Sequence, residues 1–357
     1  MAFFLTGSQY ATEDVGDDSS SGYATDHRVN GMIHFIVIAA NHGKPAEITA
    51  TGQAAIVALL EDMGPNSIFV DTFGSELSND LRQCMQSFSG GFAQRANLLL
   101  DSLVSKQRVI KVRVGPRTDG DTHAALVCND FEAISSIRGT SHLLLGSSCE
   151  ECESKGQRRA STTVISNYLL SSSLEQMRRA HQVQFFDGDD AITFQNTVIQ
   201  PMISVAGSIS FYDPLVGSKL DRDHAPRPAW NYLLGVKTLL SMVEDARRLS
   251  ARKRVAVKIV TTLPDPRDFN GSTASLRSAW IRELGLPSSF PQLDIEFCYK
   301  QAARAIFHQR YLANSRFSLS IDRGLDIVNK NGTLRQCQLD ILNERKVIHD
   351  IDESEDA

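Results

Sequence analysis

The sequence predicts an α/β protein built from two successive halves, because short apolar strands alternate with amphipathic helices along the chain. Each half opens with an apolar strand, MIHFIVIAA at 32–40 and SISFYDPLV at 208–216. In each half a helix, a strand, a second helix and another strand follow. The half then ends in a segment whose first residue is a histidine. With 357 residues, the chain is long enough for two lobes of ordinary size.

The first half follows a lead-in over 1–30 whose Asp, Ser, Gly and Thr content is typical of a flexible segment. Apolar runs predict further strands, at 67–73, 108–115, 123–130 and 141–148. Helical periodicity covers 45–64, which Gly64 and Pro65 end, and a longer stretch at about 77–106. Polar residues rich in Ser and Arg predict a surface connection at 149–172.

The second half is expected to follow a mostly helical stretch over about 173–206. Apolar residues at every third or fourth position, and the caps around them, predict helices at 229–250 and 272–285. Strands are predicted at 254–263 and 293–300, and a strand-like segment follows at 333–342. Trp230 and Trp280 lie on helix faces with other apolar residues, so both are expected in the core.

The domain organisation that these elements predict has five parts. They are a flexible segment at 1–30, a first lobe at 31–150, a partly helical connecting segment at 151–195, a second lobe at 196–350 and an acidic tail at 351–357. Asp71 and Asp213 are expected to end equivalent strands at one edge of the sheets, where capping of a turn is the favoured role for each.

The bulk composition is that of a globular protein, with 42% hydrophobic and 22% charged residues. No apolar run reaches the roughly 20 residues of a transmembrane helix, and the first residues make a poor signal peptide, so a cytoplasmic protein is expected. Six cysteines spread along the chain favour reduced thiols. Cys149 and Cys152 form a lone C-x-x-C without a second ligand pair, so neither a metal nor another cofactor is expected.

The formal net charge of −5 argues against a dedicated non-specific nucleic-acid binder, which would be basic overall. Basic clusters nevertheless occur at 106–117, 155–159 and 247–258. Each cluster alone is best explained as solvated surface. They would form a track for phosphates only if the fold brings them together in one groove.

Two histidine-led segments carry the chemistry. In the first half His123 opens a strand, Asp130 follows seven residues later, and the next strand ends in LLLGSS. In the second half His308 and Arg310 begin a strand, and the turn DRGLD follows at 322–326.

This pattern resembles the phospholipase D superfamily, whose signature is H-x-K-x4-D followed by a strand that ends in G-S-x-N. The resemblance implies two pseudo-repeated lobes, each a mixed sheet flanked by helices, and a shared site without a metal. One histidine attacks phosphorus and the histidine of the other lobe protonates the leaving oxygen. It implies as catalytic residues His308, His123, Arg310 and Asp130, and as phosphate-binding residues Ser147, Ser148, Arg323 and Asp326.

The match departs from the signature in both halves. Ala125 stands in place of the lysine and Cys149 in place of the asparagine, while Arg310 replaces the second lysine and Ser315 the second aspartate. Since one oxyanion donor contributes roughly 2.7–4 kcal/mol, these losses should raise the barrier by several kcal/mol. The remaining Arg and Ser side chains still suit an anion, so binding is favoured over turnover.

The second half also resembles a narrower family, the phospholipase-D-like domain found C-terminal to MIT domains. The resemblance covers about 195–350 and rests on SISFYDPLVG, HQR at 308–310 and IDRGLDIV at 321–328. In the eukaryotic members of that family the domain is regarded as non-catalytic and binds phosphoinositide-bearing membranes. No MIT helical hairpin is apparent in the first residues, so that association is not carried over.

Three functions follow as hypotheses. The first is a degenerate phosphodiester-binding protein whose partner is nucleic acid or, less favoured, an anionic phospholipid headgroup. The second is an active metal-independent phosphodiesterase or nuclease that uses His308 and His123. The third is a lipid-binding or assembly protein without catalysis. Protein partners, including a homodimer, stay open.

Overall fold

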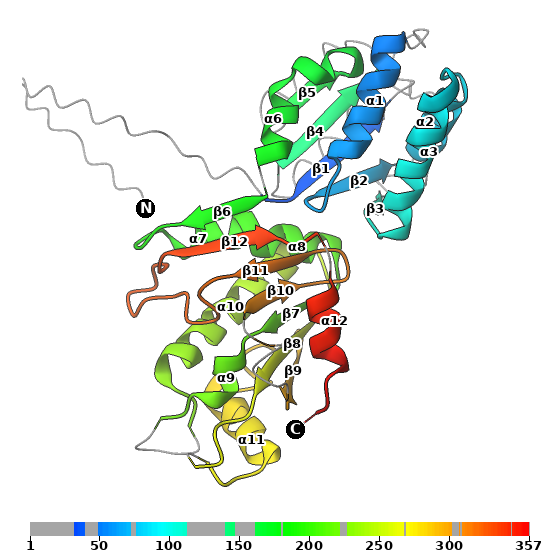
Figure 1. Cartoon of the computed structure of the whole chain (residues 1–357). Coiled ribbons are helices and arrows are strands. Elements are labelled where there is room, and N and C mark those ends of the chain that lie inside the picture. Colours follow the sequence, from blue (N-terminus) through cyan, green and yellow to red (C-terminus); the bar gives the residue numbers. More distant parts are fainter. Residues whose placement is uncertain are drawn as a thin grey trace, which may run out of the picture.

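The computed structural model describes residues 32–39, 49–72, 76–112, 140–146, 161–179, 181–221, 227–267, 269–301, 307, 309–343 and 345–356. They form an α/β protein with two sheets, each flanked by helices (Figure 1). The α/β class predicted from the sequence is therefore confirmed. No helix in these ranges combines the length and the apolar character that a bilayer crossing requires.

The first sheet has five strands in the order β3-β2-β1-β4-β5, and all of its described pairings are parallel. The strands are β1 (His34–Ala39), β2 (Ser67–Thr72), β3 (Val109–Val112), β4 (Thr140–Leu145) and β5 (Ser161–Val164). The helices of this lobe are α1 (Ala50–Asp62), α2 (Glu76–Gln86), α3 (Gly90–Ser105), the 3-10 helix η1 (Ile165–Leu170) and α6 (Ser172–Arg179). The strand β1 is buried along its whole length, as its apolar sequence predicts.

Three predictions for this lobe need correction. The described sheet is parallel rather than mixed. The single long helix expected at about 77–106 is two helices, because the chain turns at 87–89 and Gly90 has φ +35°. The surface connection expected at 149–172 contains β5, which pairs with β4, and η1, whose Ile165 and Tyr168 are buried.

The second sheet has seven strands in the order β6-β12-β11-β10-β7-β8-β9. They are β6 (Gln182–Phe185), β7 (Ser208–Tyr212), β8 (Val255–Thr262), β9 (Leu293–Lys300), β10 (Arg310–Ala313), β11 (Ser318–Ile321) and β12 (Cys337–Ile341). Strands β7, β8 and β9 are parallel, and the other pairings are antiparallel, so this sheet is mixed as expected. Its helices are α7 (Ala191–Phe194), the π-helix η2 (Gln195–Ile199), α8 (Gln200–Val205), α9 (Pro214–Ser218), α10 (Trp230–Leu249), α11 (Thr273–Leu284) and α12 (Lys346–Glu353).

The two sheets repeat one another only in part. The order β3-β2-β1 in the first sheet corresponds to β9-β8-β7 in the second, and both sets are parallel. The next strand differs, because β4 runs parallel to β1 whereas β10 runs antiparallel to β7. The stretch expected to be mostly helical over 173–206 is interrupted by β6, which joins the second sheet by pairing with β12.

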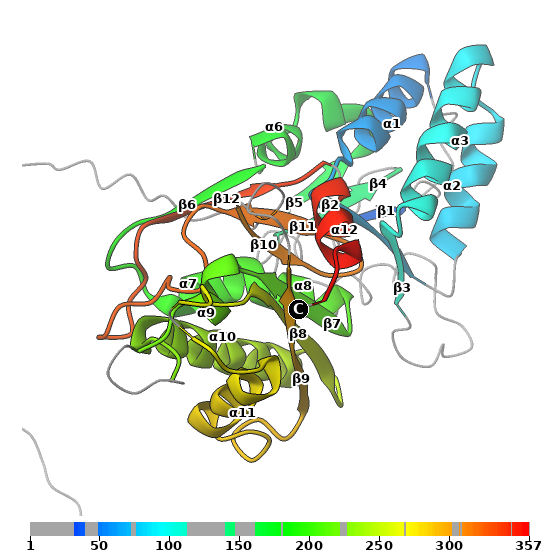
Figure 2. The ribbon, with the colours of Figure 1, turned by 60° about the horizontal axis from the view of Figure 1, so that its bottom comes forward.

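Helices cover both faces of the second sheet. Figure 2 shows α10 and α11 on one face and α12 on the other. Alternation along the strands produces this arrangement, since neighbouring residues point to opposite faces. Phe211 belongs to the main core, whereas Tyr212 belongs to a smaller cluster with Ile348 and Ile351 of α12. Residues 351–356, expected as an acidic tail, end α12 and reach the end of β9 through a bridge between Lys300 and Asp356.

The two tryptophans differ in their surroundings. Trp280 is buried and stacks on Phe297 with ring centroids 5.3 Å apart, as expected for the core. The prediction for Trp230 is wrong, because this side chain is 50% exposed. It is the first residue of α10, at the end of the apolar stripe, and the Lys330 ammonium lies 4.6 Å from the centre of its ring.

Candidate functional site

A cleft of about 670 Å³ lies at the carboxyl ends of β7, β8 and β9. The residues that follow these three strands line it, together with Phe307 and Arg310. In α/β sheets this edge is where ligands usually bind, because the loops after parallel strands open there. We call it the strand-end cleft.

Cations outnumber acids in the lining of the strand-end cleft. Among the described lining residues, Lys219, Lys300 and Arg310 face one acidic residue, Asp265. The Asp265 carboxylate already pairs with Arg267, whose Nη2 lies 2.8 Å away. The cleft therefore carries a local positive charge although the whole chain is acidic.

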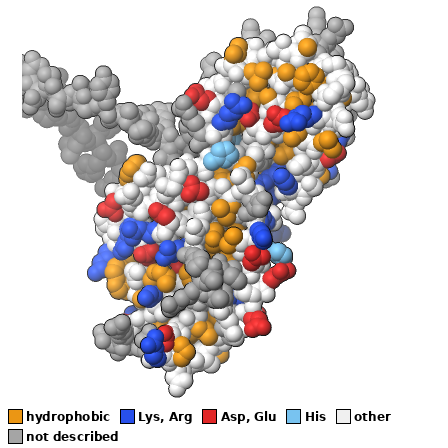
Figure 3. Space-filling view, in the orientation of Figure 1, with side chains coloured by type: hydrophobic (Ala, Val, Ile, Leu, Met, Phe, Trp, Pro, Cys, Tyr) orange, Lys and Arg blue, Asp and Glu red, His pale blue; other side chains and the backbone are white. Residues whose placement is uncertain are grey.

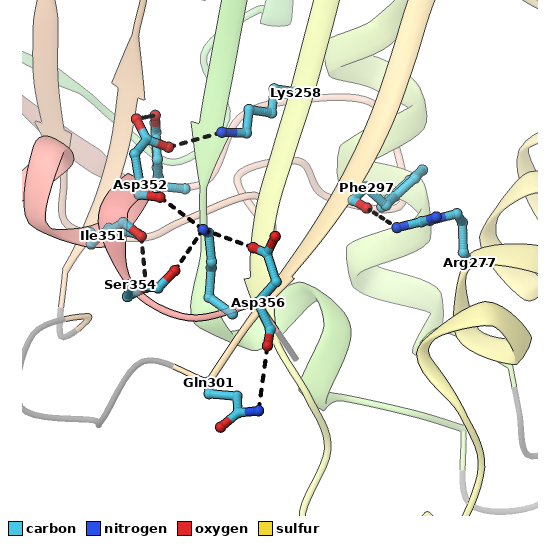
Figure 4. Close-up of polar contacts among 10 residues, drawn as sticks. Lys258, Arg277, Phe297, Gln301, Ile351, Asp352, Ser354 and Asp356 are labelled. Atoms are coloured by element: carbon cyan, nitrogen blue, oxygen red, sulfur yellow. Dashed lines mark hydrogen bonds and ion pairs between the residues drawn. The ribbon is translucent and has the colours of Figure 1, made fainter.

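The Lys300 ammonium is already occupied by the C-terminal segment. It donates to the backbone oxygens of Asp352 and Ser354, both at 2.8 Å, and pairs with the Asp356 carboxylate at 2.8 Å. Figure 4 shows these three residues around the group, with Lys258 of the neighbouring strand bound to the Asp352 carboxylate at 2.9 Å. Lys219 is exposed and forms no ion pair within the described residues. Arg310 is paired with Asp213 at 4.0 Å, but its side chain is 28% exposed, so Lys219 and the exposed part of Arg310 are left to contact a ligand.

Replacing Lys300 by methionine should lower the free energy of unfolding by about 2 kcal/mol, because the partly buried backbone oxygens of Asp352 and Ser354 lose their donor and the exposed Asp356 loses its ion pair. Urea unfolding would measure the loss. The control is Lys258→Met, because Lys258 pairs only with Asp352 and is partly exposed, and it should cost about 0.5 kcal/mol. Equal losses in the two variants would show that the C-terminal segment is not fixed through Lys300.

Arg310 connects the cleft to the turn at 322–326. Its Nη1 donates to the backbone oxygen of Asp322 at 3.1 Å, and its Nε lies 4.0 Å from Oδ1 of Asp213. The side chain is still 28% exposed. Arg310 is therefore held in place by backbone and carboxylate while part of it faces the cleft.

Asp213 is the buried centre of this arrangement, with its side chain only 1% exposed. Its Oδ1 accepts from Leu215 N at 2.8 Å and so caps α9, which confirms the capping role expected from the sequence. Its Oδ2 accepts from Leu325 N at 2.7 Å. Burial raises the pKa of Asp213, while the two N–H donors and Arg310 act in the opposite direction.

The related prediction for Asp71 is wrong in one respect. Asp71 lies within β2, the neighbour of the central β1, whereas Asp213 follows β7, the counterpart of β1. The two residues therefore do not end equivalent strands. Asp71 does have the expected capping contacts, since it accepts from both N and Oγ of Ser78 at the start of α2.

Gly324 allows the turn at 322–326 to approach Asp213. Its φ is +60°, and a Cβ atom there would lie 2.2 Å from Oδ2 of Asp213. A side chain at this position would therefore displace the carboxylate that caps α9 and faces Arg310. The close approach of the turn to Asp213 is therefore the steric reason why the DRGLD motif has a glycine at this position.

Arg323 and Asp326 lie in the same turn but outside the cleft lining. The Asp326 carboxylate lies 3.9 Å from Arg323 and 3.6 Å from Arg335, and Arg323 Nε donates to the backbone oxygen of Gln336 at 3.0 Å. The charges of this turn are thus balanced mainly among its own residues. A phosphate-binding role for Arg323 and Asp326 stays a prediction.

The other predicted site residues lie outside the described residues. These are His308, His123, Asp130, Ser147 and Ser148, and the same holds for Cys149 and Cys152. Phe307 and Arg310, on either side of His308 in the sequence, both line the strand-end cleft. Within the described ranges, no group of three His, Cys, Asp or Glu side chains is arranged to hold a metal ion.

Two cations of the cleft, Lys219 and Lys300, were not predicted as site residues. The sequence does contain a signal for Lys300, since it is the last residue of a predicted strand, at the edge where ligands bind. Lys219 follows the short helix α9, which the sequence does not separate from the preceding strand.

Comparisons with known proteins add no assignment. No protein-family model matches the sequence, and a search of curated proteins finds no significant match.

Proposed function

We propose that this chain binds phosphodiester groups, those of nucleic acid in the first place, at the strand-end cleft, through a degenerate phospholipase-D-like site. The observation that carries the proposal is Arg310, the arginine of the His-x-Arg motif, which lines a cation-rich cleft at the carboxyl ends of three parallel strands. Arginine suits this task because its planar donors match the oxygens of a phosphate group.

The charges of the cleft support a ligand with negative charge. Arg310 and the exposed Lys219 are available, and Asp265, the single acid among the lining residues that the structure describes, is matched by Arg267. Asp213 lies behind Arg310 and orients it, at 4.0 Å, without being exposed itself. A phosphate in the cleft would thus meet fixed positive charge without a large rearrangement of the protein.

Nucleic acid is preferred over an anionic phospholipid headgroup for a structural reason. Membrane-surface proteins commonly use a basic amphipathic helix with exposed aromatic residues. The described helices beside the cleft, α9 and α12, do not have this character, since α9 has five residues and α12 contains three acidic residues among its eight. The cations are instead placed in a concave site.

Removing the cations should weaken the binding of a fluorescent single-stranded oligonucleotide. Arg310→Ala should weaken it by about tenfold, because a charge-assisted hydrogen bond contributes roughly 1.5–3 kcal/mol. Lys219→Gln should weaken it about threefold and leaves the protein interior untouched, which covers the case that the Arg310 variant folds poorly. Lys237→Gln, at an exposed position on α10, is the matched control. Unchanged affinity in both cleft variants at low salt would refute the proposal.

The alternative is that the same site hydrolyses phosphodiesters. The observation that favours it is that Phe307 and Arg310, which flank His308 in the sequence, line the cleft. In that case His308 would attack phosphorus, Arg310 would neutralise the non-bridging oxygens, and His123 would protonate the leaving oxygen. Hydrolysis of a chromogenic phosphodiester that is lost in His308→Ala, with oligonucleotide binding retained, would establish turnover. Equal rates in the two proteins would exclude it. Binding to vesicles with anionic headgroups, but not to oligonucleotides, would favour the lipid-binding alternative.

A further inference from the structure

Two of the basic segments seen in the sequence meet where the two lobes are in contact. Arg316, in the turn between β10 and β11, contacts the first of these segments and the end of α8. Its Nη1 donates to the backbone oxygens of Gln107 and Val109, the latter at 3.3 Å, in the basic segment 106–117. Its Nε donates to the backbone oxygen of Val205, at the end of α8, at 2.9 Å.

The second basic segment, 247–258, reaches the same end of α8. Arg252 donates from Nε to the backbone oxygen of Ile203 at 2.7 Å and from Nη2 to that of Ser204 at 3.0 Å. These oxygens immediately precede the Val205 oxygen that Arg316 binds. Arg252 and Arg316 are thus side by side at one helix end, which favours cations because its carbonyl groups are unpaired.

Two more arginines complete the group. Arg345, before α12, donates from Nη1 to the backbone oxygen of Ser315 at 3.0 Å, next to Arg316. Arg108 precedes β3, and its guanidinium carbon lies 4.3 Å from the centre of the Phe317 ring. Phe317 is the residue that follows Arg316 in the sequence. We call Arg108, Arg252, Arg316 and Arg345 the junction arginines. Figure 3 shows Lys and Arg side chains along this lobe boundary, next to β3 and α12.

The charge of the junction arginines is not balanced by acids. Within the described part of the chain, none of the four forms an ion pair with Asp or Glu; their partners are backbone oxygens and one aromatic ring. Burial, Arg345 and Arg316 together lower the pKa of Arg108 to about 10, and burial followed by Arg252 lowers the pKa of Arg316. Arg108 is only 9% exposed, and its Nη1 has no hydrogen-bond partner in the part of the chain that the structure describes.

The contact between the lobes explains the hydrogen bonds, and the end of α8 favours the charges of Arg252 and Arg316, but neither requires four arginines in one place. Neutral donors could bind the same carbonyl oxygens, whereas four like charges in one place repel one another. A bound polyanion would offset this repulsion. Exposed lysines extend the group on both sides, since Lys106 precedes Gln107 and Lys253 follows Arg252. Cations spread over both lobes fit a row of phosphates better than a single small anion.

The junction arginines are separate from the strand-end cleft. Because β10 is antiparallel to β7, with Ala313 opposite Ser210, the turn that carries Arg316 lies at the amino end of β7. The strand-end cleft lies at the carboxyl ends of β7–β9. The two positive regions therefore lie at opposite ends of the strands of the second sheet.

We propose that the junction arginines, with Lys106 and Lys253, form a second contact surface for the phosphate backbone of a nucleic acid. The choice of this ligand class rests on the proposed function, whereas the surface itself rests on the unbalanced charge at the lobe junction. Contacts of this kind position the nucleic acid without reading its bases, so the surface is expected to be insensitive to base sequence.

The test uses the full chain and a fluorescent single-stranded DNA of about 30 nucleotides, titrated between about 50 and 200 mM salt. The variant is Lys106→Gln with Arg345→Gln, because both residues are exposed and neither donates to the opposite lobe. Since each phosphate contact on a single strand contributes about 0.7 to the slope of log affinity against log salt, the slope should become shallower by roughly 1.4. The affinity at low salt should fall about tenfold. The matched control is Lys237→Gln with Arg282→Gln, on α10 and α11, away from the junction.

The outcomes separate this inference from the proposed function. If the junction variant keeps the wild-type slope while Arg310→Ala loses affinity, the junction surface is refuted and the cleft stands. If the junction variant loses affinity and slope while the cleft variants bind normally, the junction surface stands and the cleft is refuted. If the wild-type chain shows no salt-dependent binding to the oligonucleotide, or binds only vesicles of anionic lipid, the junction surface is refuted as well.

Discussion

Replacing Gly235 by alanine should destabilise the protein by about 3 kcal/mol or more, although the residue lies inside a helix, where alanine is normally preferred. A Cβ atom at this position of α10 would lie 1.6 Å from the backbone oxygen of Leu325. Neither α10 nor the turn at 322–326 can move away easily. The turn is held in place because Leu325 N donates to the Asp213 carboxylate. Overpacking of this kind usually costs 1–3 kcal/mol, and here the obstacle is backbone rather than a flexible side chain.

The sign of the effect makes the experiment decisive. Helix propensity alone predicts that Gly→Ala stabilises by up to about 1 kcal/mol. Gly91→Ala in α3 is the matched control, because no atom outside its immediate chain surroundings lies within 4 Å of a Cβ there, and it should be neutral or stabilising. Urea unfolding of the two variants would measure the difference. A Gly235→Ala protein as stable as the wild type would contradict the packing of the turn against α10.

The same substitution connects stability to the candidate site. The turn that rests on Gly235 holds Asp213 through Leu325 N and Arg310 through the Asp322 oxygen. If the turn is displaced, Arg310 loses its support at the cleft. Gly235→Ala should therefore weaken oligonucleotide binding as well, even under conditions where the variant is fully folded.

Acidification should destabilise the protein through two buried histidines in the first lobe. The rings of His34 on β1 and His142 on β4 are stacked, with Nδ1 of His34 2.9 Å from Nε2 of His142. Both side chains are buried, and Nε2 of His34 and Nδ1 of His142 have no hydrogen-bond partner among the described residues. A proton added to either ring would thus place an unpaired charge in the interior.

The direction and size of this effect follow from the pKa values. Burial lowers the pKa of His142 from 6.5 to about 4, and burial together with His142 and His181 lowers that of His34 well below 6.5. In the unfolded chain both should titrate near 6.5. Between pH 6.5 and 4 the unfolded state therefore binds more protons, so stability is complete above about pH 7 and falls as the pH decreases. The His142 shift alone corresponds to a loss of roughly 3 kcal/mol.

Urea unfolding at a series of pH values from about 7.5 to 4 would measure the loss. In His142→Gln the decrease should be smaller by roughly 3 kcal/mol, because one titrating group is gone. The readout is the slope with pH, so a variant of lower overall stability still answers the question. His349→Gln is the control, since it removes an exposed histidine of α12 and leaves the pair intact. If His142→Gln has the wild-type slope, the buried pair does not control acid stability.

The candidate site shows where prediction from the sequence ends. Arg310 was predicted because it belongs to a motif, and the capping role of Asp213 because it follows a strand in YDPLVG. Lys300 belongs to no local motif. No local motif indicates that Arg108, Arg252 and Arg316 lie close together either. They depend on pairings between residues far apart in the chain, such as the contact of Arg316 with the Gln107 oxygen.

The sequence by itself determined the α/β class, the positions of most strands and helices, and the cap of α9, because burial and helical periodicity are written within a few neighbouring residues. Only the tertiary structure decided that β4 runs parallel to β1, that β5 and β6 extend different sheets, and that Trp230 is exposed. It also decided that Lys300 is bound by the C-terminal segment and that four arginines meet between the lobes. The physical reason is the same in each case: strand direction, exposure and charge environment depend on which distant segments pack together, and no short stretch of sequence contains that information.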